Sequence, residues 1–299
     1  MSDKQLTLMA VHAHPDDETT SGGASLVRYQ AEGVQTILVT CTDGAEGEIH
    51  DPALDEVEAR PRLAQIRAEE LARAAKIMNI SVAVNLGYGD SGMVGTPANE
   101  NPASFHQADM REATSRLVRL VRQYRPQILF SYNSFGGYGH PDHIKAYKIT
   151  AAAFDHAANL VRYPEAEFGP AWQPSKMYTS AWSQSSWMAI WKAIRDAGEE
   201  WPFQPPRKEG EPEPDPTTQE PPDFGSPDNE LTTIIDVRDY YKIPRAALQE
   251  HRTQINPNSP FTTLMNKYGE MMSGQEYFIL FKSTVPAQRP EYDLFAGLR

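Results

Sequence analysis

The fold of this chain is decided by the stretch LTLMAVHAHPDDE, residues 6–18. An apolar run, Leu6 to Val11, leads into a polar loop, and Gly22-Gly23 and a segment typical of a helix follow. This order predicts a strand, a tight loop and a helix. The loop holds two histidines and three carboxylates within seven residues. Such a density is costly unless a positive charge lies among the side chains. A zinc ion would suit, because it binds His nitrogen and carboxylate oxygen.

A second cluster, His140-Pro141-Asp142-His143, follows another apolar run, Ile128 to Tyr132. Ligands of open parallel sheets bind beyond the carboxyl ends of the strands, so both polar loops can face one crevice. Either loop alone would also fit a capped helix start with surface charges. The pair favours one bipartite metal site.

A catalytic zinc usually has three protein ligands and keeps one position open for water. The adjacent Asp16 and Asp17 cannot easily point the same way, so one can bind metal while the other serves as a general base. The same applies to His140 and His143. One can bind the metal, and the other can serve as an acid or an electrostatic partner. Asp142 either holds a histidine ring in its tautomer or is an acidic residue favoured by a helix N-terminus.

Strand and helix patterns alternate along the chain, which predicts an α/β fold with a Rossmann-like, doubly wound, mostly parallel sheet. The expected strands are 6–13, 34–42, 82–86, 128–132, 177–182, 231–237 and 277–281. The expected helices are 23–31, 61–78, 110–124, 144–160 and 245–254. His-Pro-Asp-Asp replaces the glycine-rich fingerprint after the first strand, so a dinucleotide site is not expected.

The domain organisation is expected to be a single domain over residues 1–299 with a core of about 5–200. Residues 202–227 are rich in Pro, Glu and Asp and predict a surface loop. Residues 231–299 are expected to form a C-terminal extension or lid on this domain.

Composition restricts the partners. The chain has 28 Lys+Arg against 40 Asp+Glu, a net charge of −12, which does not favour nucleic-acid or anionic-membrane binding. The single cysteine, Cys41, lies in an apolar run and predicts a buried thiol and a reducing, cytoplasmic location. No apolar stretch is long enough to span a bilayer. The oligomeric state stays open, a homo-oligomer included.

The motifs resemble a known family. Ala13-His14-Pro15-Asp16-Asp17-Glu18 together with Gly137-Tyr138-Gly139-His140-Pro141-Asp142-His143 resembles the LmbE/PIG-L zinc N-deacetylases. Supporting similarity to the mycothiol-pathway branch lies in Arg67 with Glu70, Asp90-Ser91-Gly92-Met93, His251-Arg252-Thr253-Gln254 and Gln275-Glu276-Tyr277-Phe278. That branch includes the deacetylase of N-acetylglucosaminyl-inositol and the mycothiol conjugate amidase.

The resemblance implies a role for each residue at a matching position. The zinc ligands would be His14, Asp17 and His143. Asp16 would be the general base, His140 the acid or oxyanion partner, and Tyr138 an aid at the oxyanion.

The resemblance also implies that Arg67, Asp90 and Glu46 contact the substrate. Each has a simpler alternative. Arg67 and Glu70 stand at helical i, i+3 spacing and could form a surface pair. Asp90 could shape a turn, and Glu46 could be a solvated loop acid. His12 predicts a buried structural histidine, and His251 is assigned no role.

The resemblance implies a zinc-dependent hydrolase that removes an acetyl group from the amine of an N-acetylglucosamine-type conjugate, a small-molecule substrate. The alternative is a zinc amidase that cleaves a mycothiol-like thiol conjugate. A third hypothesis is a metal-supported carbohydrate-binding protein without turnover. The free Asp16 beside three ligands argues against it, because binding alone needs no general base. Fe²⁺ could replace Zn²⁺, because such sites accept several divalent metals.

Overall fold

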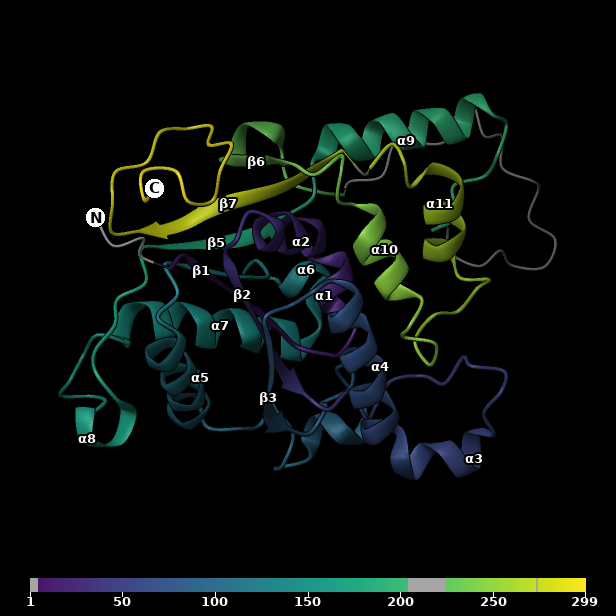
Figure 1. Ribbon diagram of the computed structural model, residues 1–299. Coiled ribbons are helices and arrows are strands. Elements are labelled where there is room, and N and C mark those ends of the chain that lie inside the picture. The colour runs from purple at the N-terminus through teal and green to yellow at the C-terminus, as the bar shows by residue number, and fades with distance from the viewer. Residues whose placement is uncertain (1–4, 204–223, 273) are drawn as a thin grey trace.

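The computed structural model describes residues 5–203, 224–272 and 274–299. Its centre is a seven-stranded sheet in the order β3-β2-β1-β4-β5-β7-β6 (Figure 1). The strands are β1 (Thr7–His12), β2 (Gln35–Thr42), β3 (Val82–Tyr88), β4 (Ile128–Ser131), β5 (Lys176–Ala181), β6 (Thr233–Asp236) and β7 (Gln275–Ser283). Neighbours from β3 through β5 pair in parallel, whereas β7 runs antiparallel to both β5 and β6. The expected doubly wound, mostly parallel sheet is confirmed.

The helices cover both faces of the sheet (Figure 1). On one face, Leu117 and Val121 pack with Met9 of β1. On the other, Leu26 and Leu8 belong to a second cluster. The main helices are α2 (Gly23–Ala31), α4 (Leu63–Ile77), α5 (Met110–Tyr124), α7 (Pro141–His156) and α10 (Lys242–Leu248). Every residue of β1 is buried, as a strand covered on both faces requires.

The C-terminal strands complete the central sheet. β7 pairs with β5, with Tyr178 opposite Leu280, and β6 forms the edge beyond it. We therefore infer that the described residues form one domain. The expected helix 245–254 begins earlier and ends at Leu248. Most of the expected loop 202–227 lies outside the described residues.

Two longer helices lie outside the elements expected from the sequence, α9 (Gln184–Asp196) and α11 (Pro260–Tyr268). Trp187, Ile190 and Ile194 of α9 pack with Leu264 of α11. The sequence analysis predicts no helix over either range. The remaining short helices include α1 (Asp17–Thr20), α3 (Glu56–Ala59), α6 (Gly136–Gly139) and α8 (Glu165–Phe168).

The sheet order reverses between β1 and β4, which is where ligands of such sheets bind. The His14 loop leaves β1 and the His140 loop follows β4, so the topology brings them together. Within the described ranges, no helix is both long and apolar enough to cross a membrane. Cys41 and His12 are fully buried, as expected.

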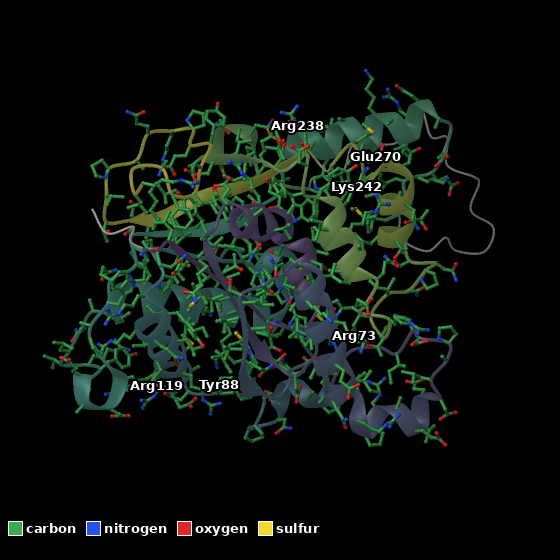
Figure 2. The ribbon with its side chains drawn as sticks, viewed as in Figure 1. Arg73, Tyr88, Arg119, Arg238, Lys242 and Glu270 are labelled. Carbon is green, nitrogen blue, oxygen red and sulfur yellow. The ribbon has the colours of Figure 1, made fainter. Side chains whose placement is uncertain are left out.

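The segment after α10 packs toward this edge of the sheet from the side of α4. Arg73 lies on α4 (Figure 2). Its Nε lies 2.8 Å from Oε2 of Glu250. This contact joins the C-terminal part of the chain to the layer that also carries Arg67.

Candidate metal centre and active site

The loop after β1 has an unusual backbone at Asp16. Its φ of 122° and ψ of −31° lie in a region that residues other than glycine rarely adopt. The two neighbouring carboxylates consequently have different partners. Asp16 lies 2.9 Å from Arg67, whereas Asp17 lies 3.5 Å from both His14 and His143. The structure thus separates two side chains that are chemically alike.

His14 and His143 face each other through single nitrogens, with Nδ1 of His14 3.2 Å from Nε2 of His143. The other nitrogen of each ring has an acceptor. Nδ1 of His143 lies 3.1 Å from the carbonyl of Gly136, and Nε2 of His14 lies 3.3 Å from Oδ2 of Asp142. Because those outer nitrogens must donate, the two facing nitrogens of the neutral rings both carry lone pairs. Such a contact needs a positive charge between the two nitrogens, supplied either by a metal ion or by a proton on one of the rings.

Asp17 completes a triangle with these nitrogens. Its Oδ2 lies 3.5 Å from Nδ1 of His14, and its Oδ1 lies 3.5 Å from Nε2 of His143. Ligand atoms about 2.0–2.1 Å from a tetrahedral zinc are roughly 3.3 Å apart. The donor types of His14, Asp17 and His143 suit zinc, and their spacing is close to that value, with a different oxygen of Asp17 nearest each ring.

Other combinations of donors are close enough to share an ion. The ligand atoms of His14, His140 and His143 all lie within 4.8 Å of one another, as do those of His14, Asp90, His140 and Asp142. The structure therefore brings the two predicted loops into one cluster and adds Asp90 to it.

The charges of the cluster agree with a cation at its centre. Burial lowers the pKa of His14, but hydrogen bonds to Asp142, Asp17 and Asp90 outweigh it and the net shift is strongly upward. Burial also acts to raise the pKa of Asp17, but nearby His143 and His14 lower it well below its usual value. Burial lowers the pKa of His143 to about 4, which leaves its ring neutral and its lone pair free.

Asp142 orients the His14 ring through Nε2, the nitrogen that does not face His143. It is fully buried at the start of α7. Besides His14, its carboxylate accepts hydrogen bonds from the backbone N–H of Ser91, at 2.9 Å, and from the Ser91 hydroxyl. Both readings of Asp142 from the sequence are compatible with this place, because it begins a helix and also holds a ring. Ser91 has no assigned role in the sequence analysis, although it lies in a motif of the resemblance.

His140 caps α7. Its Nδ1 accepts the backbone N–H of Asp142 at 3.2 Å, so Nε2 carries the proton in the neutral ring. Burial and the nearby His14 lower the pKa of His140 to about 4. The neutral ring can donate a hydrogen bond from Nε2.

Two tyrosines border the histidines. Tyr132 stacks on His143 with a centroid distance of 4.1 Å, and its hydroxyl accepts the N–H of Ala13 at 2.9 Å. Tyr138 meets His143 edge-on at 5.0 Å and is 60 % exposed. Its neighbours Gly137 and Gly139 both have positive φ, so the turn that presents it needs glycine. Tyr132 lies at a strand end, and nothing local in the sequence marks it as a site residue.

The residues expected to contact the substrate lie in different environments. Arg67 is 2 % exposed and donates to the carbonyls of Gly44, at 2.7 Å, and of Pro15, as well as to Asp16. Asp90 lies 3.6 Å from Nε2 of His14. The side chain of Glu46 is exposed, and its backbone N–H donates to Asp90 at 3.3 Å. A substrate contact by these residues stays a prediction.

Comparisons with known proteins agree with this geometry. A family model described as "PIG-L: GlcNAc-PI de-N-acetylase" matches residues 9–154. A protein of Acidothermus cellulolyticus named 1D-myo-inositol 2-acetamido-2-deoxy-alpha-D-glucopyranoside deacetylase is 40% identical, over 98% of this chain and 95% of that protein. This chain belongs to the PIG-L family.

Another relative of this chain is named as an amidase. The mycothiol S-conjugate amidase of Streptomyces coelicolor is 38% identical, over 99% of this chain and 98% of that protein. The solved N,N'-diacetylchitobiose deacetylase of Pyrococcus horikoshii is similar at a TM-score of 0.59 and 18% identity, over 92% of this chain and 83% of that one. At that identity the likeness shows the PIG-L fold alone.

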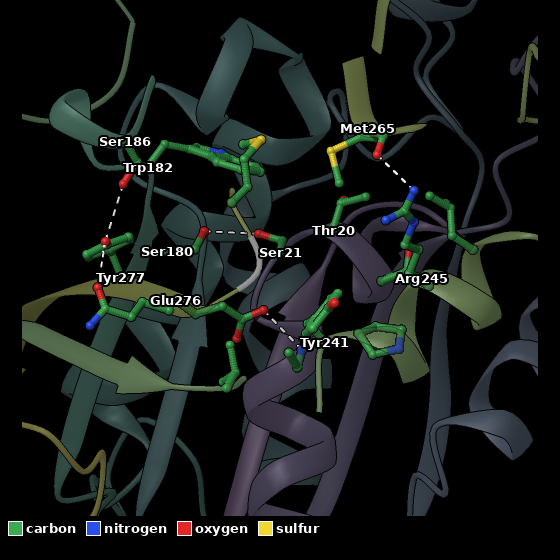
Figure 3. A pocket seen from close by; sticks show the side chains of 18 of the residues that line it. Thr20, Ser21, Ser180, Trp182, Ser186, Tyr241, Arg245, Met265, Glu276 and Tyr277 are labelled. Carbon is green, nitrogen blue, oxygen red and sulfur yellow. Dashed lines mark hydrogen bonds between the residues drawn. The ribbon is translucent and has the colours of Figure 1, made fainter. Parts of the chain in front are cut away.

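This PIG-L protein has a cavity of about 440 Å³ between the end of α1 and the C-terminal elements, and none of the proposed metal ligands lines it (Figure 3). Thr20 and Ser21, at the end of α1, form part of its wall, so it begins within one helical turn of Asp17. Trp182 and Tyr277 also line it. Aromatic side chains therefore form part of the wall of this cavity.

Glu18 and His251 are two further residues without a role in the sequence analysis. Both are fully buried, and Oε1 of Glu18 lies 2.6 Å from Nε2 of His251. The two residues are 233 positions apart in the chain. Their only local signal is that each lies in a motif of the family resemblance.

Proposed function

We propose that this chain is a zinc-dependent hydrolase that removes the acetyl group from the amine of an N-acetylglucosamine-type conjugate. One observation carries the proposal. Nδ1 of His14 faces Nε2 of His143 and the Asp17 carboxylate lies 3.5 Å from each, while the carboxylate of Asp16 lies against Arg67 instead. A site that only binds an ion needs no such free carboxylate.

His14, Asp17 and His143 would hold the metal. In such a site zinc supplies Lewis-acid activation of the amide carbonyl and of the attacking water. Asp142 keeps the Nδ1 lone pair of His14 directed at the metal by accepting the proton on Nε2. The same donor set would also accept Fe²⁺.

Asp16 acts as the general base. Burial raises the pKa of its carboxyl group to about 6, and the charge of Arg67 limits that rise. The group is therefore ionised at neutral pH, yet basic enough to accept a proton from the attacking water. Asp16 returns this proton to the amine as the carbon–nitrogen bond breaks, because the neutral ring of His140 has no acidic proton to give.

His140 and Tyr138 stabilise the oxyanion of the tetrahedral intermediate. The Nε2 proton of His140 is free to donate, because Nδ1 is engaged by Asp142. Tyr138 stands on an exposed, glycine-flanked turn beside the histidines, from which its hydroxyl can reach a bound substrate. Donors placed where negative charge develops contribute strongly to such reactions.

The substrate hydroxyls would contact Asp90 and Glu46, with the edge of Arg67 nearby. The similarity to the Acidothermus cellulolyticus deacetylase supports an amino-sugar conjugate. The cavity lined by Thr20 and Trp182 would receive the rest of the conjugate.

A second candidate function is amide hydrolysis of a thiol conjugate. The cavity of about 440 Å³ is far larger than an acetyl group, and the Streptomyces coelicolor relative carries that name. This candidate uses the same metal, base and oxyanion partners and differs in the acyl group that leaves.

The test is to incubate the zinc-loaded protein with two substrates, an N-acetylglucosaminyl-inositol and a thiol conjugate of the mycothiol type. Released acetate and released acyl-cysteine conjugate are measured separately. The deacetylase proposal expects acetate, with a higher kcat/KM on the first substrate. Preference for the second would replace it by the amidase. Tight binding of either substrate without turnover would reject both.

A further inference from the structure

We infer that Glu18 and His251 are positioning residues that hold the backbone of Asp16 in its strained conformation and thereby aim the catalytic carboxylate. The inference rests on the proposed function, because that function makes Asp16 the general base. It extends the site to a buried pair whose side chains bond each other and the backbone of Asp16.

The conformation of Asp16 needs support. At φ 122° and ψ −31° its backbone is in a sparsely populated region, and a residue stays there only when its surroundings impose it. Asn79 and Arg125 are the other described non-glycine residues with positive φ, and their values of 53° and 51° are those of ordinary left-handed turns. Asp16 is therefore the exceptional case in this chain's described residues.

Both backbone groups of Asp16 are held by hydrogen bonds. Its N–H donates to Oε2 of Glu18 at 2.9 Å. Its carbonyl accepts from the N–H of Thr19, at 3.0 Å, and from the Thr19 hydroxyl, at 2.7 Å. The carbonyl bonds are those of an ordinary helix start. The bond to Glu18 is different, because a side chain must be held in place to make it.

His251 holds that side chain. Glu18 has no solvent exposure, and its second oxygen, Oε1, lies 2.6 Å from Nε2 of His251. With one oxygen on Asp16 and the other on His251, the carboxylate cannot rotate without losing a buried hydrogen bond. Nδ1 of His251 has no hydrogen-bond partner among the described residues. The hydrogen bonding of the buried ring is thus directed to Glu18.

Docking of the C-terminal segment does not require this pair. Two residues further on, Thr253 donates to Glu70 from its N–H, at 2.9 Å, and from its hydroxyl, at 2.6 Å. These bonds and the Arg73–Glu250 contact already join the segment to α4. The His251–Glu18 hydrogen bond instead connects the C-terminal segment to the loop that carries Asp16. Its contribution is therefore separate from docking.

The consequence of losing the pair follows from these bonds. Without Glu18, the N–H of Asp16 has no acceptor and the backbone relaxes toward negative φ, which moves the carboxylate. Asp17 has its own anchor, since its Oδ2 accepts the N–H of His14 at 2.8 Å. The metal should therefore stay while the base is misplaced. A misplacement of about 1 Å can lower a rate by roughly 100-fold.

The experiment compares four variants of the zinc-loaded enzyme: Glu18→Ala, Glu18→Gln, His251→Ala and Thr253→Val. Glu18→Ala and His251→Ala are expected to lower kcat by about 10- to 100-fold, with KM within about twofold and full zinc content. Glu18→Gln keeps an oxygen for Asp16, and its amide can donate to Nε2 of His251 once the ring proton moves to Nδ1, so its kcat should stay within a few-fold of wild type. Thr253→Val should lower the melting temperature and leave kcat unchanged.

Crystal structures of the Glu18 variants provide a readout that does not depend on turnover. Asp16 is expected at negative φ in Glu18→Ala and near its present φ in Glu18→Gln. An unchanged φ and kcat in Glu18→Ala would overturn the inference, as would a kcat loss in Thr253→Val as large as that in His251→Ala. If wild type hydrolyses no amide, the proposed function fails, and the structures alone decide whether Glu18 holds Asp16.

Discussion

Replacement of Arg67 by Met should change both the stability of the protein and the pH at which it works. The guanidinium is buried and donates to Asp16 at 2.9 Å, to Gly44 at 2.7 Å and to Pro15. Breaking a buried ion pair by removing one partner costs about 3–5 kcal/mol. The side chain of Asp16 is 27% exposed, so water compensates part of this loss. We expect a decrease of about 2–4 kcal/mol in the free energy of unfolding.

The same substitution should move the pH profile of activity. The base works in its ionised form, so kcat/KM falls as the pH drops through the pKa of Asp16. That pKa is about 6 with Arg67 in place, and the Arg67 charge lowers it. A bound metal ion lowers it further, so the acid limb of the wild type should lie at or below about pH 6. Removing the guanidinium raises the pKa of Asp16, and the limb moves to higher pH.

Arg73→Met is the matched control. Arg73 lies on the same helix and forms an ion pair with Glu250, but the two side chains are 49% and 33% exposed. Such surface pairs contribute about 0–1 kcal/mol. Urea unfolding and kcat/KM between pH 5 and 9 are measured for both variants. An acid limb that does not move in Arg67→Met, together with a stability loss no larger than in Arg73→Met, would refute the reasoning. A rise in KM alone would instead favour the substrate contact implied by the family resemblance.

Three other outcomes are expected. Asp16→Asn should retain zinc and lose about 100- to 10,000-fold in kcat, while Asp17→Asn should lose zinc affinity; metal analysis and steady-state kinetics distinguish the two, and the reverse pattern would exchange their roles. His143→Ala should not bind stoichiometric zinc, and full metal content in this variant would remove His143 from the ligand set. Glu291→Leu should lower the free energy of unfolding by about 3–5 kcal/mol, measured by urea titration. The reason is that the fully buried Lys176 ammonium, 2.5 Å from Glu291, loses the carboxylate that pairs with it. A decrease below about 1 kcal/mol would contradict this prediction.

Local sequence patterns were sufficient for the first half of the fold. β1 and β2 were expected because a continuous apolar run is typical of a strand buried on both faces, and both are buried. The two polar loops were also expected to meet, because loops at the carboxyl ends of parallel strands share one edge. The meeting of the His14 and His140 loops was thus within reach of the sequence, whereas the choice of His14, Asp17 and His143 as ligands is implied by the family resemblance and stays a prediction.

The place of the last strands was decided by tertiary structure. The pattern over residues 275–283 predicts a strand, but it does not say that β7 lies between β5 and β6. Strand order depends on which sheet edge remains available after the preceding helices have packed. No local propensity encodes that, so the sequence supported only an extension or lid.

The partners of the buried charged residues could not be predicted from the sequence either. Helical spacing suggests that Arg67 pairs with Glu70, yet Arg67 bonds Asp16 and Glu70 bonds Thr253. His251 looked isolated, yet it lies against Glu18. The sequence by itself determined which segments are strands, which loops carry metal donors and which residue types can do the chemistry. Only the folded chain decided which distant charges meet, because burial makes each of them take a partner from whichever segment packs beside it.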